Sequence, residues 1–387
     1  MGDRLGTSEA VTEGHPDKVA DQVSDAVLDA ALASDRNARV ACDVLVASGL
    51  VVIAGQLTTT ARIDVVAVAR GVIREIGYLH ERDGLAADTC EVLVATTGQS
   101  PQIAAAVGRS LEGRAGEAEN RFALQGAGDQ GFMVGYASDE TPELMPLPIT
   151  LSNRLCEQLA RARRGPMPYL RPDGKAQVTV RYAAGRPDGV ATVVVSAQHA
   201  PEVSGSRLQK EIVRHVIRPV LERRGLWRQG IATYVNPGGR FEIGGPAADC
   251  GLTGRKIIAD TYGGVARHGG GAFSGKDPSK VDRSGAYAAR WVAKSVVAAG
   301  FAARCEVHVA YAIGVAQPIA VDIECFGTEH EDISTIERWV EDTFDLRPAA
   351  IVDALDLLRP IYRKTAAYGH FGRDDPDFGW ERPRPPG

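Results

Sequence analysis

Two strand-like runs followed by a helical pattern recur three times along the chain, and no other feature limits the fold as much. In each copy two apolar, β-branched runs flank a turn or short loop, and the segment that follows places apolar side chains three or four positions apart. The copies run through residues 39–76, 175–217 and 303–344. Their spacing is too long for a solenoid repeat. We therefore predict an α+β fold of three similar domains, each with helices packed on one face of a sheet.

The composition is that of an ordinary globular chain of 387 residues, 44% hydrophobic and 24% charged. A net charge of -5 argues against nucleic acid as the main partner, because the phosphate backbone favours a basic surface. The cysteines lie far apart, without metal-ligand spacing. No apolar run approaches the ~20 residues that cross a bilayer, and the start of the chain lacks the features of a signal peptide. We expect a cytoplasmic protein with no membrane partner.

Residues 245–283 mix many glycines with both signs of charge. Glycine lets a backbone approach an anion closely, basic side chains neutralise phosphate, and carboxylates hold Mg²⁺ against phosphate oxygens. The alternative is a solvated glycine loop, but the density of both charges argues against it. The stretch therefore predicts a polyphosphate site. Its charged candidates are Asp249, Arg255, Lys256, Lys276, Lys280 and Asp282.

Two glycine motifs resemble nucleotide-binding loops but fail in context. Residues 270–276 read G-x-x-x-x-G-K, yet Asp277 follows where a P-loop has the hydroxyl that binds Mg²⁺. Residues 126–131 read GAGDQG, yet the next residues predict a strand instead of the helix on which a dinucleotide rests. Asp129 would repel phosphates there and suits a ribose hydroxyl or an ammonium group. Neither motif is interpreted as a P-loop or a dinucleotide site.

Two predicted helices place charged residues at their N-termini. One begins at Pro16, a favoured first helical position, with apolar residues on one face and acidic residues on the other. His15 and Asp17 then lie at its start. The other begins near Ser279 or Asp282. Helix N-termini attract anions, which fits phosphate recognition, whereas ordinary capping is the alternative for both aspartates.

The polar, alanine-rich region from residue 99 to 126 predicts a long mobile loop, and loops of this length are usually lids or disordered. The proline-rich tail predicts a frayed end. The predicted division is an N-terminal domain (3–101), a mobile active-site loop (102–123), a central domain (124–244), a C-terminal domain (245–375) and the tail (376–387).

Several motifs along the chain are far more specific than a short glycine pattern. They are SEAVTEGHPDKVADQVSDAVLD near the start, GAGDQG in the middle, and GPAADCGLTGRKIIADTYGG and HGGGAFSGKDPSKVDRS later. Together they resemble the methionine adenosyltransferases, also called S-adenosylmethionine synthetases, over nearly the whole chain. The resemblance implies three related domains about a pseudo-threefold axis. It also implies active sites shared between the subunits of a homodimer, which often pairs into a homotetramer.

The reaction implied by the resemblance is attack of the sulfur of L-methionine on the 5′ carbon of ATP, which expels tripolyphosphate. The tripolyphosphate is then hydrolysed to pyrophosphate and phosphate. A thioether needs no deprotonation, so the first step requires no general base. The rate must come from in-line positioning and from stabilising charge on the leaving polyphosphate.

The resemblance also assigns individual roles. His15 lies near the bridging oxygen of the leaving group, Asp17 and Asp282 hold Mg²⁺, with two ions per site, and Asp129 reaches the site from the partner subunit. The implied catalytic residues are His15, Lys175, Arg255 and Lys276. The implied ATP-binding residues are His15, Asp173, Lys175, Arg240, Phe241, Asp249, Arg255, Lys256, Ala272, Lys276 and Ile313. The implied methionine-binding residues are Gln56, Gln99, Asp129, Asp249 and Lys280.

Three departures from the family pattern bear on substrate and cation binding. Gln56 stands where the family has a glutamate that grips the methionine ammonium, and Asp43 stands where it has the glutamate associated with K⁺. The region predicted as a mobile loop is also longer than usual. A hydrogen bond to a charged group contributes about 1.5 to 3 kcal/mol. We therefore expect a paralogue with weaker methionine binding or a preference for a methionine analogue, and a shifted or lost K⁺ site.

Two other function classes remain as alternatives. A nucleotide-binding regulatory subunit without turnover is one, although the retained phosphate-binding side chains argue against it. A P-loop kinase is the other, and it would release ADP, which the implied reaction does not.

Overall fold

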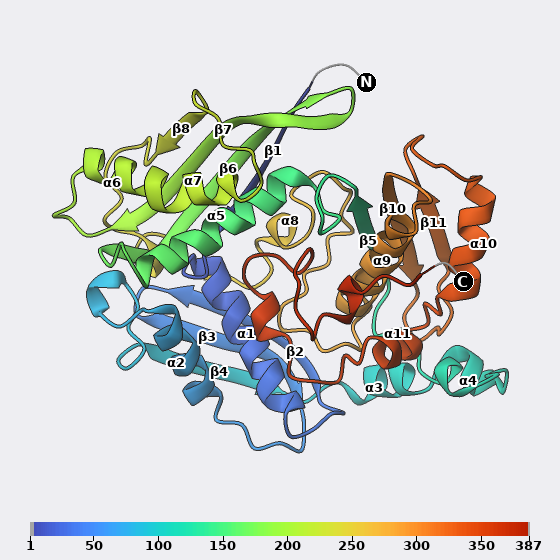
Figure 1. The fold of residues 1–387 in the computed structure, drawn as a ribbon. Coiled ribbons are helices and arrows are strands. Elements are labelled where there is room, and N and C mark those ends of the chain that lie inside the picture. The colour runs from blue at the N-terminus through green and yellow to red at the C-terminus, as the bar shows by residue number, and fades with distance from the viewer. Residues whose placement is uncertain (1–3, 386–387) are drawn as a thin grey trace.

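The computed structural model describes residues 4–385 and contains three β-sheets (Figure 1). The first is ordered β1 (Arg4–Val11), β6 (Leu170–Ala183), β7 (Arg186–His199), β8 (Ala232–Val235). The second is ordered β4 (Glu91–Thr97), β3 (Leu50–Thr58), β2 (Arg39–Ala47), β9 (Gly251–Leu252). The third is ordered β11 (Ala320–Glu324), β10 (Arg304–Tyr311), β5 (Gly131–Ser138). Strands β3 and β4, and β7 and β8, pair in parallel, and the other neighbours are antiparallel.

One long helix covers each sheet. Helix α5 (Leu147–Arg163) packs on the first sheet, α1 (Pro16–Leu32) on the second, and α9 (Val281–Ala298) on the third. The three predicted hairpins form as β6–β7, β2–β3 and β10–β11. The prediction of three similar α+β domains is confirmed.

Each long helix packs on a different sheet from the strand that precedes it in the sequence. Strand β1 joins the first sheet while α1 covers the second, β5 joins the third while α5 covers the first, and β9 joins the second while α9 covers the third. This cyclic exchange ties the three units together about their common centre (Figure 1). The sheets therefore cross the boundaries of the predicted domains 3–101, 124–244 and 245–375, because strand pairing joins segments that are distant in sequence.

Shorter helices follow each hairpin as predicted. They are α2 (Val65–Ile76), α6 (Gly205–Ile212) with α7 (Arg218–Glu222), and α10 (Ile333–Thr343). The second predicted copy ends at residue 217, but a π-helical turn at Val213–Ile217 carries the chain into α7. In a π turn each amide bonds to the carbonyl five residues earlier instead of four. This shift in hydrogen bonding allows Pro219, which has no amide hydrogen, to follow without ending the helix. No helix of the described residues is long and apolar enough to span a bilayer.

The segment predicted as a mobile loop, residues 102–123, has secondary structure. It contains α3 (Pro101–Gly108), α4 (Leu111–Ala115) and a short 3-10 turn. The carboxylate of Glu112 accepts hydrogen bonds from the backbone amides of Ala316 and Gln317, at 3.0 and 3.1 Å. The segment is therefore fastened to the loop after β10.

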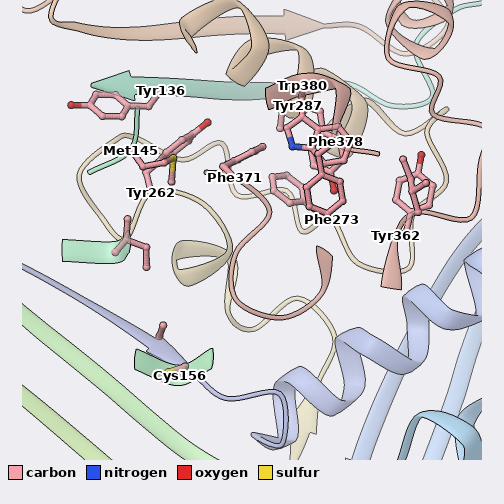
Figure 2. Close-up of a cluster of buried hydrophobic side chains, with 14 of the residues drawn as sticks. Tyr136, Met145, Cys156, Tyr262, Phe273, Tyr287, Tyr362, Phe371, Phe378 and Trp380 are labelled. Atoms are coloured by element: carbon pink, nitrogen blue, oxygen red, sulfur yellow. The ribbon is translucent and has the colours of Figure 1, made fainter. Parts of the chain in front are cut away.

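The prediction of a frayed tail is wrong for the described residues 376–385. Figure 2 shows Phe378 and Trp380 inside a cluster of buried aromatic side chains, and both are 0% exposed. Trp380 stacks on Tyr287 of α9 with ring centroids 4.0 Å apart. The carboxylate of Glu381 pairs with Arg290 at 2.9 Å. The tail is ordered because its aromatic and acidic side chains contact residues of α9. The many prolines around these side chains in the sequence led to the prediction of a frayed end. The helix α11 (Pro348–Ala354) packs on the same helix.

Candidate active site

A first group of site residues surrounds the start of α1. His15 is the N-cap of the helix, and its Nδ1 accepts a hydrogen bond from the backbone amide of Asp17 at 3.2 Å. Because Nδ1 is the acceptor, the proton of a neutral ring lies on Nε2. Burial, followed by the charge of Lys256, lowers the pKa of His15 to about 3. His15 is therefore a neutral hydrogen-bond donor at physiological pH.

Asp17 connects the start of α1 to the basic loop after β9. Its carboxylate pairs with the ammonium of Lys256 and accepts a hydrogen bond from the backbone amide of Leu252 at 3.0 Å. Burial favours protonation of Asp17, but these hydrogen bonds outweigh burial and lower its pKa. The guanidinium of Arg255 lies 4.0 Å from the same carboxylate and is about half exposed. Two cations thus converge on one buried carboxylate.

Strand β6 adds Asp173 and Lys175 to the first group. One oxygen of Asp173 accepts a hydrogen bond from the backbone amide of Gly245 at 2.8 Å, whereas the other is buried without a protein partner. Burial raises the pKa of Asp173. The charge of Lys175 lowers the pKa of both Asp173 and His15, and the charge of Asp249 raises both.

Arg240 and Phe241 lie on the chain segment that leads to Gly245. The carbonyl of Phe241 accepts a hydrogen bond from the backbone amide of His199 at the end of β7, at 2.9 Å. Arg240 is exposed, and its guanidinium pairs with Glu242. The structure thus fixes the backbone at Phe241, while the Arg240 side chain lies at the surface.

A second group gathers at the start of α9. The ammonium of Lys276 lies 2.6 Å from the carboxylate of Asp282, and the backbone of Lys276 forms a β-bridge with Ala41 of β2. Lys280 is the N-cap of α9, and its ammonium pairs with Asp277. Ala272, on the loop before Lys276, lies against the first group. A Cβ on Gly254, the residue before Arg255, would lie only 2.6 Å from the Cβ of Ala272.

Gln56 and Asp43 lie on the face of the second sheet that points away from α1. In β2 and β3 the buried residues alternate with these positions, and Gln56 pairs in register with Ala41, the residue that bridges to Lys276. The backbone amide of Gln99 donates a hydrogen bond to the hydroxyl of Thr58 at 2.8 Å, at the same end of the sheet. The predicted methionine and K⁺ positions therefore share one outward face.

The GAGDQG loop lies against the start of α9 in the same chain. A Cβ on Gly128 would lie 2.3 Å from the carbonyl oxygen of Ser279, so only glycine allows this approach. Ala127 forms a β-bridge with Ile313. Asp129 and Ile313 therefore belong to the second group of their own chain, and β5 follows the loop, as expected for a motif that binds no dinucleotide.

The carboxylates of the site fit Mg²⁺ only together with phosphate oxygens. Among the described residues no three His, Cys, Asp or Glu side chains gather at metal-binding spacing. Mg²⁺ typically takes one or two protein carboxylates and completes its octahedron with phosphates and water. Asp17 and Asp282 each provide a carboxylate beside a lysine, a setting that matches this pattern.

Three buried residues of the site region were missed by the sequence analysis. They are Asp21, Asp25 and Arg283, all 0% exposed. The acidic face of α1, which reads as a solvated face, is instead buried against the loops of the site. The spacing of its aspartates, every fourth residue from Asp17, is the signal that could have identified Asp21 and Asp25, whereas no local pattern marks Arg283.

The fold is that of a three-domain α+β protein, and its candidate site residues form two clusters of mixed charge. Sequence models of the S-adenosylmethionine synthetase family match the chain as the N-terminal domain at residues 3–101, the central domain at 124–241 and the C-terminal domain at 243–382. The chain therefore belongs to this family of methionine adenosyltransferases, which confirms the resemblance drawn from the motifs.

Curated relatives match the chain almost from end to end. An S-adenosylmethionine synthase of Desulforudis audaxviator is 57% identical over 383 residues, which cover 99% of this chain and 96% of the relative. S-adenosylmethionine synthase 1 of Frankia casuarinae is 58% identical over 389 residues, covering 99% and 97%. The S-adenosylmethionine synthase of Salinispora arenicola is 58% identical over 385 residues, covering 98% and 96%.

Proposed function

We propose that this protein makes S-adenosylmethionine from ATP and L-methionine, and that it hydrolyses the tripolyphosphate to pyrophosphate and phosphate. The observation that carries the proposal is the neutral, buried His15, whose pKa the charges of Lys256 and Lys175 lower, next to Asp17, whose carboxylate lies close to Lys256 and Arg255. A neutral donor and several cations suit a leaving group that gains negative charge as its bond to carbon breaks.

In this proposal His15 and the basic side chains of the first group act on the polyphosphate, Asp173 lies near the nucleotide, and Asp249 contacts methionine. The Nε2–H of His15 donates a hydrogen bond to the oxygen that leaves the 5′ carbon. The three basic side chains bind the phosphates and stabilise the charge that develops on them. The sulfur of methionine attacks without a base, so positioning of the two substrates supplies the remainder of the rate.

Mg²⁺ is the proposed cofactor, with Asp17 and Asp282 as its protein ligands and two ions per site. When bound, it neutralises phosphate charge and orients the oxygens. In the absence of phosphate each aspartate pairs with a lysine, Lys256 or Lys276. These lysines would then turn to the phosphates when the ions arrive. Asp43 is the proposed protein ligand for K⁺.

The amino-acid site is proposed around Gln56, Gln99, Asp129 and Lys280. The neutral amide of Gln56 accepts a hydrogen bond from an ammonium but does not attract its charge. We propose weaker methionine binding than a glutamate would give, or a preference for an analogue with an altered amino group.

A homodimer with shared active sites is proposed from the outward face of the second sheet. This face carries Gln56 and Asp43 together with apolar side chains, of which Leu93 is 47% and Leu252 38% exposed. Exposed apolar area of this kind usually marks an interface. A second copy would cover it and bring the first group of one chain to the second group of the other. Asp129 would then reach the partner's nucleotide.

The test is mass spectrometry of the products after incubation of the protein with ATP, methionine, Mg²⁺ and K⁺, with methionine analogues altered at the amino group as parallel arms. S-adenosylmethionine with equal amounts of pyrophosphate and phosphate supports the proposal. If only a methionine analogue reacts, the altered amino-acid preference is assigned to Gln56. ATP binding without any product favours the regulatory-subunit alternative, and ADP favours a kinase.

A further inference from the structure

Helix α1 holds the loops of the site through a row of aspartates spaced four residues apart. Each carboxylate accepts hydrogen bonds from backbone amides of a distant segment. The bonds join Asp17 to Leu252 at 3.0 Å, Asp21 to Gly254 at 2.9 Å, Asp25 to Gly275 at 2.8 Å, and Asp29 to Tyr362 and Arg363 at 2.9 and 2.8 Å. The first two fasten the loop that carries Arg255 and Lys256, and the third fastens the loop that carries Lys276.

The third position of this row carries a buried ion pair. The guanidinium of Arg283 on α9 binds both oxygens of Asp25, at 2.6 and 2.8 Å, and the two side chains are almost fully buried. Arg283 also lies over the ring of Tyr362, 4.3 Å from its centroid. Its Nε donates a hydrogen bond to the hydroxyl of Tyr287 at 3.2 Å. Tyr287 and Tyr362 both belong to the buried aromatic cluster of Figure 2, so the ion pair lies beside this cluster. Burial opposes charge on Arg283, but Asp25 outweighs it and holds the pKa above its usual value.

The pair binds the Lys276 loop from two sides. Asp25 accepts the backbone amide of Gly275, while Arg283 donates to the carbonyl oxygens of Phe273 and Lys276, at 3.0 and 3.2 Å. Asp282, which directly precedes Arg283, contacts the Lys276 ammonium at 2.6 Å. The backbone on both sides of this lysine–aspartate contact is thus fixed by one buried pair.

We propose that Asp25 and Arg283 are positioning residues for the reaction, which set the places of Lys276 and Asp282 without touching substrate themselves. The inference rests on the proposed function, because it assigns those two residues to phosphate and Mg²⁺. A buried ion pair is costly to desolvate and is weak support for stability. The pair joins α1 to α9 and binds three backbone groups of the loop that carries Lys276. A role in fixing the position of this loop explains why the pair is present.

Helix α9 supplies a matched control. Arg290 is also 0% exposed, binds both oxygens of a buried carboxylate, Glu381, at 3.0 and 2.9 Å, and donates to three backbone carbonyls. The carbonyls belong to Tyr136, Glu143 and Leu144, away from the residues of the site. Arg283→Lys and Arg290→Lys therefore remove the same fork from the same helix, one beside the site and one away from it.

The experiment compares these two variants with the full-length wild-type protein well below their melting temperatures. We expect both to lose thermal stability. Only Arg283→Lys should lower kcat, by roughly 10- to 100-fold, and raise the Mg²⁺ concentration for half-maximal rate, with the KM for methionine unchanged. Equal kcat losses in both variants, or a normal kcat and Mg²⁺ dependence in Arg283→Lys, would overturn the proposal.

Two further arms keep the inference separate from the proposed function and from a folding defect. The shift of the melting temperature by tripolyphosphate with Mg²⁺ needs no turnover, and it should be smaller in Arg283→Lys than in Arg290→Lys. Equal shifts in the two variants count against the inference, whereas a wild type that makes no S-adenosylmethionine counts against the proposed function. If Arg283→Lys does not fold, the neutral pair Asp25→Asn with Arg283→Gln takes its place, compared with Arg290→Gln with Glu381→Gln by the same criteria.

Discussion

At the scale of single residues, the environment of His15 decides its chemistry. Burial and Lys256 lower its pKa to about 3, against 6.5 for an ordinary histidine. Between these two values the unfolded chain binds a proton that the folded chain does not. The contribution of His15 to stability is therefore complete above pH 6.5 and is lost as the pH falls toward 3. Throughout the neutral range the ring keeps one proton and one charge state.

The first prediction follows from this fixed charge state. His15→Ala should lower kcat by roughly 100-fold or more, the usual cost of removing a donor to a developing anion. It should leave the pH dependence of log kcat between pH 6 and 8 unchanged in shape, because His15 does not titrate there. Steady-state rates across this range, with denaturation midpoints as the control for folding, provide the check. An acidic limb present in the wild type and absent in the variant would contradict the account.

Gln56 gives the second prediction. Gln56→Glu should lower the KM for methionine by about one to two orders of magnitude, since it restores a charged partner for the ammonium. The KM for ATP should not change. Gln209→Glu, at an exposed position on α6, is the control for added negative charge. Initial rates at varied methionine decide the matter, and an unchanged KM in Gln56→Glu would show that this residue does not contact the ammonium.

At the scale of elements, local patterns predicted the hairpins, the helices that follow them, and α1 and α9, but not the long helix α5. Contacts between distant segments could not be read from such patterns. The apolar, β-branched runs predicted the strands β2 and β3. Nothing local indicated that β1 pairs with β6, and only the four-residue spacing of its aspartates pointed to the buried acidic face of α1. The motifs named the charged residues of the site, whereas Asp25 and Arg283 gain their partners only through the fold.

The third prediction concerns the tail, whose composition suggested disorder. Trp380→Ala should lower the free energy of unfolding by about 3 to 5 kcal/mol, the usual cost of emptying a buried aromatic site. Trp227→Ala, at a partly buried position, should cost clearly less. Urea unfolding followed by circular dichroism measures both. Equal small losses would mean that the tail does not pack in solution as it does here.

At the scale of the whole molecule, the cyclic exchange of strands makes the three units one body with a divided site. The two groups of site residues lie at the starts of two different helices, α1 and α9, and the predicted amino-acid site faces outward beside exposed apolar side chains. The proposed dimer explains both features, because each active site would take residues from two chains. Its arrangement could be expected from the resemblance but not from any pattern along the chain.

The fourth prediction tests this arrangement. Leu93→Glu places a charge on the exposed face of the second sheet, so it should give a folded monomer with little or no activity. Its melting temperature should fall below that of the wild type, because the stabilisation by the partner subunit is lost. Ile333→Glu, on the exposed side of α10, should alter neither mass nor rate. Sedimentation velocity and initial rates measure the two properties together. A fully active Leu93→Glu monomer would rule out shared active sites across this face.

The central claim is transfer of the adenosyl group to sulfur with release of all three phosphates together. Carbon NMR of a reaction that contains methionine, Mg²⁺ and ATP labelled with ¹³C at the 5′ position tests it most directly. The account predicts that the labelled signal moves from a phosphate-ester carbon to a sulfonium-bound carbon as pyrophosphate and phosphate appear, without ADP. A label that stays on a phosphate ester while ADP accumulates would contradict it.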